Sequence, residues 1–135
     1  MRRALFRPRA IRRLLMALVV ALPVVSACEP GDGDVASANQ ITGGDADRGR
    51  ELIRSYGCGT CHSIPGVTGA SGLVGPPLGG IASRAYIAGV LPNAPDNMLR
   101  WLHDPRAVDS LTAMPNVGLT PSDARHIAAY LYTLR

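Results

Sequence analysis

The distribution of hydrophobic and polar positions predicts short helices separated by loops rich in glycine and proline. The clearest helix is the last one, for which Thr120 is a suitable N-cap and Pro121 fits the first helical position. Its apolar positions recur at helical spacing: Ala124, Ile127, Ala128, Leu131 and Leu134. No segment shows a convincing strand pattern, so we expect an all-α fold.

Helices are also expected earlier in the chain, over residues 46–56, about 80–88 and about 97–103. In the first of these, Asp45 is a good N-cap and Gly57 breaks the helix. Gly49 lies inside that helix, where a glycine costs about 1 kcal/mol relative to alanine. A glycine at such a position often marks the close approach of a second helix.

The first 27 residues differ from the rest of the chain. Six arginines precede an apolar run of 14 residues, from Leu14 to Ala27, which is shorter than the roughly 20 residues that span a bilayer. A basic start, a short apolar stretch and small residues at its end predict a secretory signal peptide over residues 1–27. A true membrane-anchor helix is the alternative, which the short length and Pro23 weaken.

The end of this segment, Val25-Ser26-Ala27-Cys28, resembles a bacterial lipobox, so the signal peptide is of the lipoprotein type and Cys28 is expected to be lipidated. The alternative is ordinary cleavage after Ala27, which would leave a free thiol. A free thiol is a liability in an oxidising compartment, which favours lipidation. Two or more acyl chains would anchor the protein stably to a membrane.

Residues 28–43 are rich in Gly, Asp and Ser and lack a hydrophobic period. We expect a lipidated N-terminus followed by a flexible linker with a reach of roughly 20 Å, and then one domain over residues 44–135. Once the signal is removed, the formal charge changes from +4 to −2, because eight arginines face ten acidic residues. The net positive charge of the full sequence therefore comes from the predicted signal peptide and does not indicate a nucleic-acid partner.

The segment with the most specific chemistry is Cys58-Gly59-Thr60-Cys61-His62. Two cysteines three positions apart, followed directly by a histidine, have the spacing for covalent attachment of a c-type haem. In this interpretation Cys58 and Cys61 form thioethers with the porphyrin, and His62 is the first axial ligand of the iron.

A redox dithiol or half of a zinc site could also use a C-x-x-C pair. A dithiol would normally follow a strand, and no strand-like run precedes Cys58. A zinc site would need a second ligand pair, whereas the remaining cysteine, Cys28, lies far upstream. Haem attachment is therefore favoured.

The sixth ligand of the iron has several candidates. Met98 and His103 fall in a predicted helix, where packing or surface roles are simpler, and His126 is expected to be exposed beside the last helix. Met114 lies in a loop before a proline, so its thioether can be aimed without disturbing a helix. We expect Met114 to be the ligand, with an open or histidine-ligated site as the alternative. Two filled axial positions predict electron exchange rather than chemistry on a substrate.

Several features follow one another in a familiar order: Gly49 and Ile53, Cys58-x-x-Cys61-His62, Gly75-Pro76-x-Leu78, Arg84, Trp101 to Pro105, Ala113-Met114-Pro115, and Tyr130-Leu131. This order resembles class I cytochrome c, and particularly the cytochrome c domains associated with haem-copper oxidases, including caa3-type subunit II. The resemblance implies three to five helices wrapped around one covalently attached haem c and its iron.

The resemblance also implies individual roles. Pro76 would offer its carbonyl to His62, Arg84 would hydrogen-bond a haem propionate, and Trp101 would pack beside the macrocycle. For Arg84, the alternative is a solvated surface arginine. The terminal helices would cross with Gly49 and Ile53 packed against Tyr130 and Leu131. The chain departs from the mitochondrial pattern because it has no lysines around the haem edge.

The sequence thus predicts an electron-transfer protein rather than an enzyme, held by a lipid anchor at the periplasmic face of a bacterial membrane. It would feed a terminal cytochrome oxidase, with a cytochrome bc complex or a dehydrogenase among its redox partners. Alternatives are a haem sensor or peroxidase-like enzyme with a labile sixth ligand, or a fixed haem subunit of a larger dehydrogenase or oxidase complex.

Overall fold

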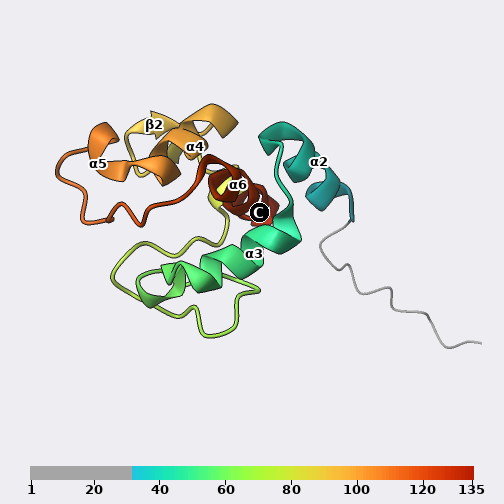
Figure 1. Ribbon diagram of the computed structural model, residues 1–135, viewed down its shortest axis with the longest axis horizontal. Helices are drawn as coiled ribbons and strands as arrows, with labels where there is room; N and C mark the ends of the chain where they lie inside the picture. The colour runs from blue at the N-terminus through green and yellow to red at the C-terminus, as the bar shows by residue number, and fades with distance from the viewer. Residues whose placement is uncertain (1–31) are drawn as a thin grey trace, which may run out of the picture.

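The computed structural model describes residues 32–135, which form short helices gathered around the last helix of the chain (Figure 1). The elements are α2 (Asp32–Thr42), α3 (Ala46–Ser55), η1 (Cys58–Thr60), η2 (Ile81–Ser83), β1 (Tyr86–Ile87), β2 (Leu91–Pro92), α4 (Pro95–His103), α5 (Pro105–Val108) and α6 (Pro121–Thr133). The expected signal peptide and Cys28 lie outside the described residues. Within them, no helix is both long enough and apolar enough to cross a membrane.

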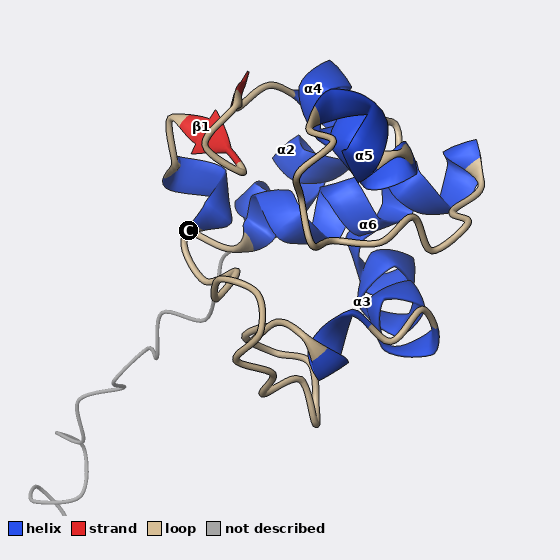
Figure 2. Ribbon diagram, turned by 90° about the vertical axis from the view of Figure 1, so that its left-hand side faces the viewer, coloured by secondary structure: helices blue, strands red, loops and turns tan. Residues whose placement is uncertain are grey.

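Helix α6 is the centre of the structure, and α2, α3, α4 and η2 all pack against it (Figure 2). It begins as expected, with the Thr120 hydroxyl accepting a hydrogen bond from the Asp123 amide and with Pro121 in the first turn. Two successive residues, Ala128 and Ala129, are completely buried. Their small side chains allow neighbouring helices to approach from two sides.

The close approach expected at Gly49 is confirmed. A Cβ atom on this glycine would overlap the carbonyl oxygen of His126 and lie 2.6 Å from its carbonyl carbon, so α3 and α6 touch through their backbones. The atoms nearest to Gly49 belong to the backbone of His126 and Ile127, and Ile53 lies in the same core cluster as Tyr130 and Leu131.

Hydrogen bonds on either side of this contact fasten the two helices. The amide of Asp45 donates to Nδ1 of His126 (2.9 Å), and the hydroxyl of Tyr56 donates to the Asp123 carboxylate (2.8 Å). This second bond lowers the pKa of Asp123 and raises the pKa of Tyr56. His126, expected to be exposed, is therefore half-buried at the crossing.

The expectation of a flexible linker over residues 28–43 is wrong for its described part, which forms helix α2. Ala38 and Thr42, one turn apart, are buried in the core of the domain, and Val35 packs beside them. The domain therefore includes α2 and does not begin at residue 44. The error has a physical cause, because three small side chains at helical spacing suffice to hold a helix that has little hydrophobic surface.

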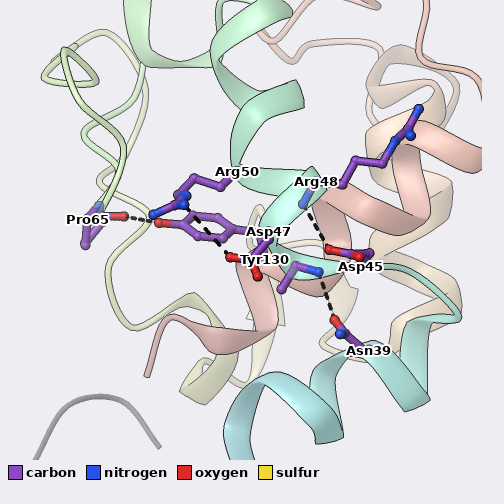
Figure 3. A network of polar contacts seen from close by, with 8 residues as sticks. Asn39, Asp45, Asp47, Arg48, Arg50, Pro65 and Tyr130 are labelled. Carbon is purple, nitrogen blue, oxygen red and sulfur yellow. Dashed lines mark hydrogen bonds and ion pairs between the residues drawn. The ribbon is translucent and has the colours of Figure 1, made fainter. Parts of the chain in front are cut away.

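Polar contacts complete the docking of α2. The side-chain oxygen of Asn39 accepts a hydrogen bond from the Ala46 amide at 2.8 Å and so caps α3, next to the expected Asp45 cap (Figure 3). At the other end of the helix, Asp34 forms an ion pair with Arg135 at 3.0 Å. Because α2 supplies a cap for α3, it is an integral part of the fold.

The prediction of a helix over residues 80–88 is also wrong. Residues 81–92 instead form the short turn η2 and then the antiparallel pair β1–β2, joined by a turn in which Ala88 and Gly89 have positive φ. The amide nitrogen of Asn93 donates to two carbonyls before the hairpin, and its oxygen accepts from Tyr132 of α6. The sheet has only two residues in each strand, so the all-α class is confirmed.

Candidate haem site

A cavity of about 600 Å³ lies on one side of α6, between the loop that follows η1 and the loop that precedes α6. Its walls are mainly aliphatic, and many of them are core side chains: Ile53, Ile64, Ile81, Met98, Trp101, Leu102, Leu119, Ile127 and Leu131. The volume and the lining are those of a site for an apolar ligand.

The structure brings the predicted site residues of the described chain together around this cavity. Its lining includes Cys58, Cys61, His62, Pro76, Arg84, Trp101 and Met114. They come from η1, the two loops, the end of η2 and α4, which are separated in the sequence. Figures 1 and 2 show these two loops on the same side of α6.

The cysteines lie on a tight turn directly after α3. Gly57 has a φ of 72°, a left-handed conformation that glycine adopts without strain, and this turns the chain into η1. The amides of Cys61 and His62 both donate to the Cys58 carbonyl, at 3.3 and 3.0 Å. The turn therefore presents both thiols and the imidazole to the same cavity.

Burial raises the pKa of the Cys58 thiol. A reactive redox dithiol needs a lowered thiol pKa, so this environment does not favour the dithiol alternative. Within residues 32–135, no group of three or more His, Cys, Asp or Glu side chains is placed to hold a metal ion, so the zinc alternative gains no support either.

The imidazole of His62 is held by its neighbours. Its Nδ1 lies 2.7 Å from the carbonyl oxygen of Pro76, which is the hydrogen bond expected from the sequence. With Nδ1 as donor, Nε2 keeps its lone pair free for a metal. Such an outer hydrogen bond fixes the orientation of the ring and makes it a more basic ligand.

Glycines allow the loop over residues 63–80 to lie directly against this turn. The amide of Gly75 donates to the Cys61 carbonyl at 2.8 Å, and a Cβ atom on Gly75 would lie 2.6 Å from Nδ1 of His62. The amide of Gly72 donates to the Gly59 carbonyl at 3.1 Å. The position of the imidazole therefore depends on residues that lack a side chain.

Arg84 braces the same loop from the other side. Its guanidinium donates from Nη2 to the carbonyl oxygens of Pro77 (2.5 Å) and Gly79 (3.0 Å). This contact was not predicted from the sequence. Tyr130 of α6 adds a second brace, donating to the Pro65 carbonyl at 2.6 Å (Figure 3).

Among the candidates for the sixth position, Met98 and Met114 line the cavity, whereas His103 and His126 do not. Met98 belongs to α4, and its side chain is buried, with 2% of its surface exposed. Met114 is half-buried in the loop before α6, and its amide donates to the Thr112 hydroxyl at 3.2 Å. The sequence did not predict that Met98 would line the cavity.

The family model for cytochrome c matches residues 46–135, two thirds of the chain. The chain belongs to the cytochrome c family. It is therefore an electron-transfer protein with a covalently bound haem c and its iron, and it has the class I fold. The fold class and the cofactor expected from the sequence are confirmed.

A similar protein is the cytochrome c oxidase subunit 2 of Alkalihalophilus pseudofirmus (strain ATCC BAA-2126 / JCM 17055 / OF4), which is 29% identical over 105 residues. The match covers 77% of this cytochrome and 30% of the relative. The chain thus spans less than a third of the length of the curated relative that it matches. This likeness relates the cytochrome to oxidase-associated domains.

The residues of the cavity fit this cofactor. A haem presents a broad apolar surface, and the cavity walls are aliphatic and aromatic. Covalent attachment requires two thiols beside a coordinating histidine, and both thiols and His62 border the cavity.

Gly75→Ala should displace the His62 ring or the loop and reduce the free energy of unfolding of the holoprotein by about 1–3 kcal/mol, as overpacking does. The NMR signal of the His62 Nδ1 proton should shift with it. Denaturant unfolding and proton NMR measure the two effects.

Gly79→Ala is the matched control. It lies in the same loop, lacks a positive φ, and its Cβ would meet the Pro65 ring at 3.3 Å. Equal effects of the two substitutions would contradict the special role of Gly75.

Proposed function

We propose that Cys58 and Cys61 carry the two thioether bonds to haem and that His62 and Met114 are the axial ligands. The support is their joint position on the wall of one apolar cavity. The bond from His62 to the Pro76 carbonyl leaves Nε2 as the coordinating nitrogen. When bound between an imidazole and a thioether, haem c exchanges single electrons at a raised potential.

Met114 is preferred to Met98 because of their local structures. Met98 belongs to a regular helix and to the buried core, so a change in its side chain would disturb packing. Met114 lies between Ala113 and Pro115 in a segment without regular secondary structure, where the backbone can place the sulfur independently of a helix. Met98 would then pack against the macrocycle, as would Trp101.

Arg84 would contact a haem propionate. It lines the cavity, and the two carbonyl bonds made through Nη2 leave other guanidinium N–H groups as donors. The bracing of the loop and the propionate contact are compatible roles for one guanidinium.

The cavity as a whole supports an electron carrier rather than an enzyme. Its lining contains no Asp or Glu, His62 is committed to the Pro76 carbonyl, and Arg84 is held by the loop. His62 and Arg84 are therefore engaged with backbone carbonyls rather than placed for proton transfer to a substrate. The protein would therefore exchange electrons with partners at the cavity mouth.

Met114→Ala should open the sixth position. The ferrous wild-type protein is expected not to bind carbon monoxide at neutral pH, whereas the variant should bind it and lose the methionine–iron charge-transfer band in the red part of the spectrum.

Met98→Leu serves as control and should retain the band and the resistance to carbon monoxide. A band that survives in the Met114 variant but disappears in the Met98 variant would reverse the ligand assignment. Binding of carbon monoxide by the wild type would instead favour the sensor or peroxidase-like alternative.

We further propose that the cytochrome delivers electrons to a terminal oxidase at the extracytoplasmic face of a bacterial membrane. The similarity to an oxidase subunit 2 supports the partner, and the basic, apolar start of the sequence supports export. If Cys28 is lipidated, the anchor lies four positions before Asp32, the first residue of α2, so the domain would stay close to the membrane.

Cys28→Ser should release the protein from the membrane fraction, because the lipobox cysteine supplies the acyl attachment. Fractionation followed by visible spectroscopy measures the distribution. A variant that stays in the membrane fraction after salt washing would contradict lipidation as the anchor.

A further inference from the structure

Two of the segments that line the cavity lack charged side chains, although the charged Arg84 also lines it. Residues 57–83 and 110–122 contain no Asp, Glu, Lys or Arg. Both segments contribute to the cavity wall, the first through the loop after η1 and the second through the loop before α6. Charged residues border them at Arg54, Arg84, Asp109 and Asp123.

The same two loops expose large apolar side chains. Leu73 is 91% exposed and Leu111 is 92% exposed, the highest values among the large hydrophobic residues of the described chain. Each is the neighbour of a cavity-lining residue, Val74 and Thr112 respectively. Leu73 and Leu111 are not part of the lining themselves, unlike Val74 and Val117.

We define the mouth surface as Leu73 and Leu111, which are exposed and lie outside the cavity lining. Exposed apolar side chains from two loops around one opening mark an interaction site better than isolated surface leucines do. The core of a protein interface is typically depleted of charge and rich in apolar side chains, which is the composition found here.

We propose that the mouth surface is the docking site for the electron-transfer partner and that the partner presents an uncharged, apolar face there. The proposal rests on the proposed electron-carrier function. A charged partner face would lose hydration on docking and would find no opposite charge in either loop. Affinity would therefore come from apolar contact, and charge steering would contribute little to association.

Two reactions of the reduced holoprotein test the proposal. The first is oxidation by membranes of the source organism that lack this cytochrome. The second is electron self-exchange between ferrous and ferric copies, measured by NMR, in which the partner is a second copy with the same apolar mouth.

The variants are Leu73→Glu and Leu111→Glu, compared with Ile41→Glu as a control of equal net charge. Ile41 is 49% exposed on α2, which contributes no residue to the cavity wall. The mouth variants should react at least about tenfold more slowly in both reactions at low salt, because a charge would be buried without a partner. The control should change by less than about twofold, and all variants should retain the wild-type spectrum and reduction potential.

Mouth variants that react like the control in both reactions would overturn the proposal. A wild-type rate with membranes that changes more than about tenfold between low and high salt would also overturn it, since it would show charge steering. If membranes do not oxidise the wild type but self-exchange depends on the mouth, the oxidase partner fails and the mouth surface stands.

Discussion

The hydrophobic core of this cytochrome and the wall of its haem cavity are built from the same side chains. Ile53, Ile127 and Leu131 hold α3 against α6 and also line the cavity. The cavity has a volume of about 600 Å³ and is lined by core side chains. Cofactor binding and folding therefore depend on the same packing contacts.

The turn that carries Cys58, Cys61 and His62 is likewise fixed by the surrounding structure. Its backbone is fixed by Gly57, by two bonds to the Cys58 carbonyl, and by the loop that lies against it. Arg84 and Tyr130 tie that loop to the rest of the domain through backbone carbonyls. The turn and the proposed ligand His62 are thus held mainly by hydrogen bonds to backbone carbonyls.

Local chemical signals were predictable from the sequence. The Cys58-to-His62 spacing, the Thr120 and Asp45 caps and the glycine at the helix crossing each depend on a few neighbouring residues. Features that depend on tertiary contacts were not predictable from the sequence. Helix α2 has small apolar contacts and a linker-like composition, and the hairpin depends on Asn93, whose partners lie up to 39 residues away. The exposure of Leu73 and Leu111 likewise required the structure.

The central claim is that Cys58 and Cys61 hold the haem covalently. Trypsin should release residues 55–84 as one peptide, because arginines occupy positions 54 and 84 and none lies between. After acid–acetone treatment and digestion, mass spectrometry of this peptide should show the added mass of one haem, and the peptide should keep its colour. Extraction of the pigment into the solvent, with the peptide at its unmodified mass, would contradict the account.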